Sequence, residues 1–427
     1  MTIVMFACFL ILMFIGVPIF LSLLSTAFIG FLYLGDWSLF RIMIQQFFGG
    51  MNVVTLMAIP FFILTGNLMN KTGITDRLLN FSRVLVGHLR GGLGHVNVVA
   101  SIIFAGISGS AAADSSALGS ILIPAMVKEG YPRSYSAGLT AGSSLIGPII
   151  PPSIFMVLYG TMTNVSIGGL FVAGVVPGIM LGAAFIIMNY YYSKKYDYPV
   201  SNEKAGLAEI VRVGLQSLVA LIAPLIIIGG IVLGVVTPTE AGAIAVLYTI
   251  IVGFFVTRQL KMEAFFSAIF ETVRSTSVVF VIMGSASIIS WLLKWEQVPQ
   301  KFAGFLIAMT DNSTVLLFVL SFIIFLIGMF MEEVAALTLL TPIIAPVATA
   351  MGIDPFHFGV VMTLNITIAL ITPPMGACVY IVSAVGNVEL ETLFKKIWPF
   401  VAFAMLTVSL IILFPAITLF LPRLFGY

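Results

Sequence analysis

The stretch Gly147-Pro148-Ile149-Ile150-Pro151-Pro152-Ser153 stands in the middle of an apolar segment, 133–160, that could otherwise cross a membrane as one helix. Each proline lacks a backbone N–H, and each ring clashes with the preceding turn, so an α-helix cannot continue through the three of them. The carbonyl oxygens of Gly147 to Ile150 therefore lose their helical partners. We expect a discontinuous membrane helix whose free carbonyls can bind a cation.

The composition of the whole chain is that of a membrane protein. Of its 427 residues, 60% are hydrophobic and 8% are charged, whereas soluble domains are about one quarter charged. We expect an all-α polytopic membrane protein embedded in lipid. A net charge of +2 does not indicate a nucleic-acid partner. The two cysteines, Cys8 and Cys378, lie in apolar segments and are assigned no function.

The broken segment has a counterpart 222 residues later. A gap-free shift of that length aligns Gly106 with Gly328, Pro124 with Pro346, Gly130 with Gly352, and Pro151-Pro152 with Pro373-Pro374. At nearly the same shift Pro18 matches Pro238, which indicates separate spans over 2–15 and 18–34. An odd number of spans in each half makes the halves antiparallel, so we expect two inverted-topology repeats, as in many secondary transporters.

A segment rich in Gly, Ser and Ala, residues 105–116, precedes the first break. Such a segment must pack against protein, because non-helical backbone at membrane depth is tolerated only beside protein or a water-filled cavity. We expect re-entrant helical hairpins over 93–127 and 313–350, with the first tip near 106–110. The alternative is a continuous helix that uses its small residues for close packing.

The repeat divides the chain into five parts. They are scaffold spans with a cytoplasmic arm helix (1–92), a first hairpin and broken helix (93–192), a cytoplasmic linker (193–213), scaffold spans with a periplasmic arm helix (214–312), and a second hairpin, broken helix and last span (313–427). The arm helices are the amphipathic stretches 74–92 and 295–311, for which ordinary loops are the alternative. Fifteen of the 19 Lys and Arg residues fall on one side. The positive-inside rule makes that side cytoplasmic and both termini periplasmic.

Two sodium sites are predicted where the hairpin tips meet the breaks, because neutral carbonyl and hydroxyl oxygens replace the hydration shell of a monovalent cation. The first site would use Ser108, Ser110, Gly147, Ile150 and Pro152. The second site would use Gly328, Phe330, Glu332, Ala369, Thr372, Pro374 and Met375. We expect two or more Na⁺ ions as coupling ions, and sites that differ chemically because Met375 matches Ser153.

Candidate substrate ligands are polar residues at the tips and breaks, since ionisable groups inside a membrane are costly and mark function. They are Ser108, Ser153, Asp114, Glu332, Glu333 and Asn365. Helix capping is the alternative role for Asp114, and hydrogen bonding between helices is the alternative for Asn365. The chain has no phosphate-binding loop for ATP and no catalytic motif, so we expect a transporter that is not an enzyme.

Four stretches of the sequence form a specific combination. They are Gly-Ile-Ser-Gly-Ser-Ala-Ala-Ala-Asp (106–114), Pro-Arg-Ser-Tyr-Ser-Ala-Gly-Leu-Thr-Ala (132–141), Ile-Gly-Pro-Ile-Ile-Pro-Pro-Ser (146–153) and the second tip, Gly-Met-Phe-Met-Glu-Glu-Val (328–334). Together they resemble the large membrane subunit of tripartite ATP-independent periplasmic (TRAP) transporters. The resemblance covers essentially the whole chain. It implies sodium-coupled import across the bacterial inner membrane by an elevator mechanism, with a small four-helix membrane subunit and a periplasmic substrate-binding protein as partners. The implied substrates are organic acids such as sialic acids or C4-dicarboxylates, with the sialic acid branch the nearest.

Three alternatives are weighed at this point, one within transport and two from other functional classes. A stand-alone sodium/anion symporter shares the hairpin and broken-helix design but needs no binding protein. An intramembrane enzyme would need a clustered acid, base or metal set, which the sequence does not offer. A structural membrane scaffold would have little use for two matched helix breaks.

Overall fold

The computed structural model describes residues 1–35, 39–199 and 204–427, and every regular element in these ranges is a helix. The first half contains α1 (Thr2–Phe14), α2 (Ile19–Leu34), α3 (Phe40–Met51), the 3₁₀ helix η2 (Val54–Met57), α4 (Ala58–Lys71), α5 (Ile74–Val86), α6 (Gly92–Ser108), α7 (Ala111–Lys128), α8 (Arg133–Ser144), α9 (Ile154–Thr163) and α10 (Ile167–Lys195). The separation of α1 from α2 agrees with the prediction made from Pro18, which is the N-cap of α2.

The second half follows a similar order. It contains α11 (Leu207–Val232), α12 (Pro238–Ile251) with the π-helix η3 (Val252–Val256), α13 (Met262–Trp295), α14 (Val298–Met309), α15 (Ser313–Gly328), α16 (Glu333–Ala350), α17 (Pro355–Ala369), α18 (Ala377–Gly386), α19 (Leu390–Lys396), α20 (Trp398–Leu413) and α21 (Ala416–Leu424). The amphipathic stretches expected at 74–92 and 295–311 contain α5 and α14, so both are helical.

Two predicted boundaries are corrected. The linker expected over 193–213 is shorter, because α10 continues to Lys195 and α11 begins at Leu207; residues 200–203 lie outside the described ranges. Lys194 and Lys195 occupy the last turn of α10, where positive charge stabilises a helix C-terminus. The apolar residues over 52–69 predict a further span, and in the structure this span is preceded by α3, which bends by 50° into α4.

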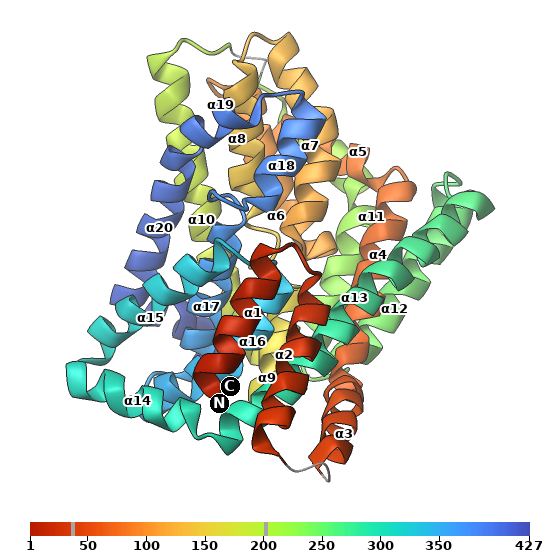
Figure 1. Cartoon of the computed structure of the whole chain (residues 1–427). Coiled ribbons are helices and arrows are strands. Elements are labelled where there is room, and N and C mark those ends of the chain that lie inside the picture. Colours follow the sequence, from red (N-terminus) through yellow and green to blue (C-terminus); the bar gives the residue numbers. More distant parts are fainter. Residues whose placement is uncertain (36–38, 200–203) are drawn as a thin grey trace.

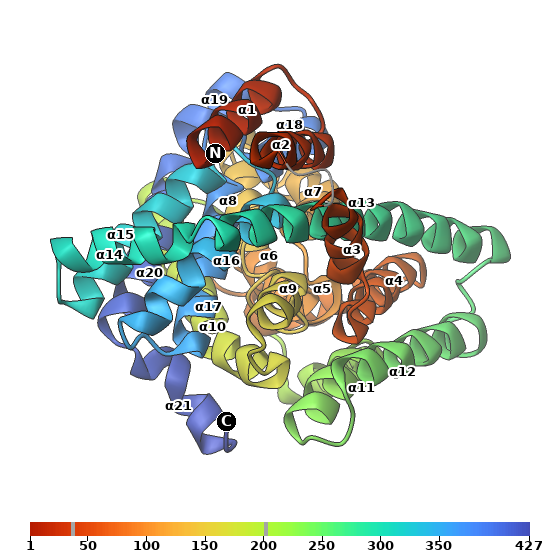
Figure 2. The same ribbon diagram turned by 60° about the horizontal axis from the view of Figure 1, so that its bottom comes forward.

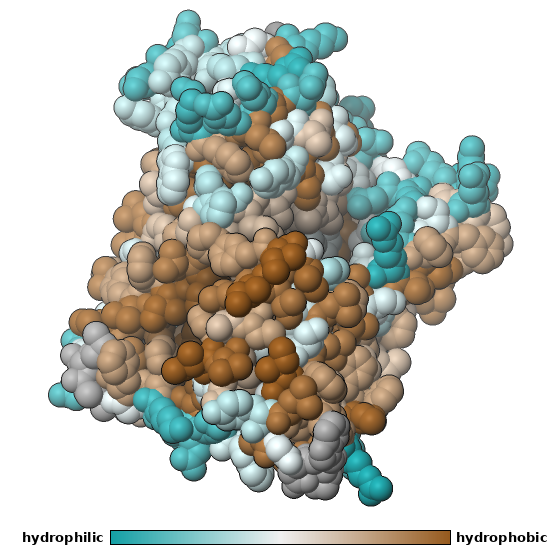
Figure 3. All heavy atoms as spheres, in the orientation of Figure 1, coloured by the Kyte–Doolittle hydropathy of each residue, from teal (hydrophilic) through white to brown (hydrophobic). Residues whose placement is uncertain are grey.

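The helices are suited to a membrane. Within the described ranges, five elements are long and apolar enough to cross one, and up to seven if two bent pairs each count as a span. The five are α10, α11, α12 with η3, α13 and α16, and the pairs are α3 with α4 and α19 with α20. Figure 3 shows a wide band of hydrophobic residues between hydrophilic ends, as a lipid-facing surface requires.

The hairpins and breaks lie in the middle of the molecule. The 34-residue helix α13 runs across it, as Figure 2 shows, and contacts α2, α3, α4 and α16. Figure 1 shows α6 to α8 beside α18, and α18 packs directly on α7 and α8. The second half therefore inserts its broken helix against the first hairpin, so the candidate site is built from both halves.

Candidate functional site

The tip of the first hairpin is a tight three-residue turn. Helix α6 ends at Ser108, Gly109 has a left-handed φ of 59°, and Ser110 is the N-cap of α7. The Ser110 hydroxyl accepts a hydrogen bond from the Ala113 N–H at 3.4 Å. Because glycine adopts positive φ without a Cβ penalty, Gly109 allows the chain to reverse within so few residues.

The first break spans residues 145–152, between α8 and α9. Its peptide groups form short hydrogen-bonded turns; for example, the Gly147 N–H donates to the Ser144 carbonyl at 3.0 Å. The peptide bond between Pro151 and Pro152 is cis. Among the described residues, no donor pairs with the carbonyl oxygens of Gly147, Ile150 and Pro152. These are three of the five groups predicted for the first cation site, and their oxygens are free to take a ligand.

The tip and the break of the first half are in direct contact. A Cβ placed on Gly109 would lie 2.3 Å from the Pro152 carbonyl oxygen, and one on Gly147 would lie 3.3 Å from the Ser110 carbonyl oxygen. The Ser108 hydroxyl lies in the same turn, 3.5 Å from the Ser110 backbone N–H. Four predicted ligands of the first site are thus gathered in one place, while the Ile150 side chain packs toward Gly178 of α10.

The second tip and break meet in a related way. A Cβ on Gly328 would lie 3.0 Å from the Ala369 Cβ, and the Met375 N–H donates to the Met329 carbonyl at 3.3 Å. The Thr372 hydroxyl is buried and donates to the Ile368 carbonyl at 2.9 Å. A hydroxyl that donates in this way keeps its lone pairs, so Thr372 can still serve as a cation ligand.

A cavity of about 180 Å³ lies at the second tip and break. Among its lining residues are Gly328, Glu332, Glu333, Ala369 and Met375 from the second half and Ala112 from the first turn of α7. The two hairpins therefore share one cavity.

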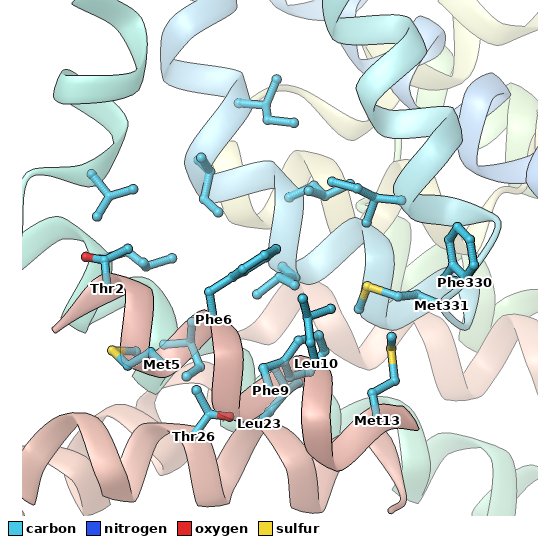
Figure 4. A pocket seen from close by; sticks show the side chains of 18 of the residues that line it. Thr2, Met5, Phe6, Phe9, Leu10, Met13, Leu23, Thr26, Phe330 and Met331 are labelled. Atoms are coloured by element: carbon cyan, nitrogen blue, oxygen red, sulfur yellow. The ribbon is translucent and has the colours of Figure 1, made fainter. Parts of the chain in front are cut away.

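Two other predicted members of the second site point elsewhere. The side chain of Phe330 faces a separate apolar cavity, shown in Figure 4, and Pro374 is exposed. Only their backbone groups could contribute to the second site.

The structure places four of the predicted substrate residues, and three of these have local roles. The Ser153 hydroxyl donates to the Pro148 carbonyl and accepts from the Met156 N–H, which makes it the N-cap of α9. Glu332 caps α16 by accepting from the Ala335 N–H at 3.0 Å. Asn365 accepts from Ser321 at 2.8 Å and donates to Val361, so its amide joins α15 to α17, which is the alternative role stated for it.

Asp114 is the fourth. Asp114 is 1% exposed, and the Ser101 hydroxyl lies beside its carboxylate, although neither carboxylate oxygen accepts a hydrogen bond of standard geometry from the described residues. The helix cap that Asp114 was expected to provide as an alternative is made by Ser110 instead.

The structure also reveals a buried polar network that the sequence reasoning missed. Asn97 of α6 donates to Thr140 of α8 at 2.7 Å, and Ser143 bonds both Asn97 and Ser101. These bonds fasten the first hairpin to the broken helix. The signal in the sequence was the spacing of Asn97 and Ser101, four residues apart on one helical face.

Cys378, to which no function was assigned, is fully buried and lines the 180 Å³ cavity. Ser115 and Ser144, which are hydrogen-bonded to each other at 2.8 Å, lie beside its thiol. Glu333 also lies at this cavity, and its Oε2 has no hydrogen-bond partner among the described residues. The cavity wall therefore combines a free carboxylate oxygen of Glu333 with the Cys378 thiol, and Ser115 and Ser144 of the first half lie behind that thiol.

Comparisons with known proteins identify the family of this chain. The family model of the tripartite ATP-independent periplasmic transporter, DctM component, matches residues 6–417. The sialic acid TRAP transporter large permease protein SiaM of Vibrio cholerae is 42% identical over 417 residues, which are 97% of each chain. The sialic acid TRAP transporter permease protein SiaT of Haemophilus influenzae is 39% identical over 97% of this chain and 67% of that protein.

More distant relatives extend the same family. The C4-dicarboxylate TRAP transporter large permease protein DctM of Pseudomonas aeruginosa is 36% identical over 87% of each chain. The crystal structure of the Alcanivorax borkumensis YdaH transporter superposes with a TM-score of 0.65 at 16% identity, over 88% of this chain and 87% of that one, which shows a shared fold. This chain belongs to the DctM family, the large permease components of tripartite ATP-independent periplasmic transporters.

Proposed function

We propose that this chain is the transporting subunit of a sodium-coupled, binding-protein-dependent secondary transporter that imports a small organic acid by an elevator mechanism. The observation that carries the proposal is the contact between a hairpin tip and a proline break in each half. In the first half this contact is the approach of Gly109 to Pro152, and in the second it is the hydrogen bond from Met375 to Met329. The first contact brings backbone oxygens together with the hydroxyls of Ser108 and Ser110, and the second break carries the Thr372 hydroxyl, groups that suit Na⁺.

The helix boundaries support the repeat, and its inverted orientation remains part of the proposal. Helix α16 is displaced from α7 by 222 residues at both of its ends, and α18 is displaced from α9 by 223. We infer that parts 93–192 and 313–427 form one transport domain, because Ala112 and Cys378 line the same cavity. In this proposal the transport domain moves against a scaffold formed by 1–92 and 214–312, with the connector in 193–213 joining the halves.

The substrate class rests on the relatives. Their names specify sialic acid, C4-dicarboxylates and 2,3-diketo-L-gulonate, all of them small organic anions. We assign a sialic acid or C4-dicarboxylate type of substrate to this chain. Glu333 would meet such an anion through a bound cation or as the protonated acid, because two bare carboxylates repel each other.

A tripartite transporter has two further components. We propose a small four-helix membrane subunit and a periplasmic substrate-binding protein as partners, and the bacterial inner membrane as the location. Figure 1 shows the N-terminus and the C-terminus toward the part of the molecule that carries α14. This supports placing both termini on the same side of the membrane, which is the periplasmic side in this proposal.

Uptake by proteoliposomes that hold this chain and its small partner tests the proposal. The sodium gradient and the binding protein are varied independently, with radiolabelled sialic acid and a C4-dicarboxylate as substrates. We expect uptake of one substrate to be lost when either the gradient or the binding protein is removed. Uptake that needs sodium without binding protein would favour a stand-alone symporter, and uptake without sodium would refute the coupling.

A further inference from the structure

A large apolar cavity separates the second hairpin from the first helices of the chain. It has a volume of about 720 Å³ and is bounded by α1, α2, α13 and α14 on one side and by α15 and α16 on the other. Figure 4 shows Phe6, Phe9 and Leu10 of α1 directed toward α16. Thr2 and Thr26 carry the only polar side chains among the described residues that line this cavity.

We propose that this cavity binds one acyl chain of a membrane phospholipid. Protein interiors leave few voids larger than a water molecule, so an empty space of this size would forfeit the dispersion contacts of its whole lining. Water is a poor occupant because it would find almost no hydrogen-bond partner there. The volume falls within the roughly 300–1,000 Å³ of ordinary ligand sites.

The length of the cavity matches one leaflet. Helix α1 borders it from Thr2 to Phe14, which at 1.5 Å per residue is about 18 Å. Half of a hydrocarbon core of about 30 Å is about 15 Å. Figure 4 shows Thr2 near one end and Met13, Phe330 and Met331 near the other, so an acyl chain would run from the membrane surface to the second hairpin tip.

The surroundings fit a lipid at both ends. Ile3 and Phe14, which line the cavity on α1, are 85% and 73% exposed, so the cavity wall continues onto the lipid-facing surface seen in Figure 3. At the Thr2 end, which Figure 1 shows toward the same end of the molecule as α14, Val298 and Phe302 of α14 line the cavity, and Lys301 on the same helix is exposed. That lysine places a positive charge where a headgroup phosphate would lie.

Quenching of tryptophan fluorescence by brominated phospholipid tests the site. Phe9 lines the cavity and is only 4% exposed, so a tryptophan in Phe9→Trp can be quenched strongly only if a brominated chain enters the cavity. Phe322→Trp on α15, where Phe322 is 64% exposed, reports ordinary lipid contact, and Phe171→Trp, at a fully buried position outside the cavity, reports none. The fluorescence of the parent chain is subtracted from that of each variant, so that the signal of the native tryptophans is removed.

The measurement is made on the full chain with its small partner subunit, in bilayers of phosphatidylcholine brominated in mid-chain. We expect Phe9→Trp to be quenched to an extent similar to Phe322→Trp. Quenching no greater than that of Phe171→Trp would overturn the proposal, whether the cavity is empty or filled by a helix of the small subunit. Leu340→Trp, on the opposite wall at 4% exposure, repeats the test if Phe9→Trp does not fold.

Discussion

Replacing Gly109 by alanine should separate the first hairpin tip from the proline break. The added Cβ would lie 2.3 Å from the Pro152 carbonyl oxygen, so one of the two must move by about 0.7 Å to restore 3.0 Å. Ligand distances in a metal site tolerate about ±0.2 Å. We therefore expect the sodium concentration for half-maximal uptake to rise at least about tenfold, equivalent to about 1.4 kcal/mol.

Gly352→Ala is the matched control for this substitution. Gly352 also has a positive φ, which is 72° compared with 59° at Gly109. A Cβ added at Gly352, however, would have no heavy atom of a neighbouring residue within 4 Å. Both variants share a backbone cost of about 1–2 kcal/mol for a left-handed residue with a Cβ. The assay is sodium-dependent uptake in proteoliposomes, with thermal unfolding measured alongside. Equal sodium dependence in the two variants would refute the role assigned to the Gly109 and Pro152 contact.

Three further substitutions probe the remaining site residues. Thr372→Val should raise the sodium requirement about tenfold, whereas Thr367→Val, which removes a similar bond to the preceding turn, should leave it unchanged in the same uptake assay. Asp114→Asn replaces a buried carboxyl group that has no ion-pair partner among the described residues, so we expect a higher thermal unfolding midpoint together with reduced uptake; a lower midpoint would show that its neighbours compensate the carboxyl group. Asn365→Leu should lower stability by about 1 kcal/mol, the worth of an interhelical hydrogen bond, and a rise in the substrate KM without loss of stability would instead place Asn365 in the binding cavity.

The backbone features of the site could be predicted because they depend on proline and glycine. Pro148, Pro151 and Pro152 exclude a continuous helix whatever surrounds them, and the described structure has no helix over 145–152. Gly109 could likewise be placed at the hairpin tip from the cluster of small residues. These residues act through their own covalent geometry, so their effect is local and readable from sequence.

The roles of the polar side chains could not be predicted because each depends on its neighbours. Glu332 and Ser153, which are predicted as substrate ligands, also cap α16 and α9, and Asn365 bonds across to Ser321. Cys378 was assigned nothing, yet the packing of α18 on α7 brings it to the cavity wall. Such contacts join residues from different parts of the chain, and no local pattern specifies them.

The ends of the helices were predictable only in part. The polar residues after 192 suggested a linker, but α10 continues to Lys195 because basic side chains are favourable at a helix C-terminus. Helix α3 was missed because Arg41, Gln45 and Gln46 interrupt its apolar pattern. Its packing on α13, rather than its own hydrophobicity, stabilises it.

The central claim is that each tip and break together hold a sodium ion, and direct measurement of sodium binding tests it most sharply. Equilibrium binding of radioactive sodium to the purified complex of this chain with its small subunit should saturate at two or more ions per chain. Gly109→Ala and Thr372→Val should each weaken sodium binding at one site about tenfold, and the double variant should weaken binding at both sites. Saturable binding that the double variant leaves unchanged would contradict the account.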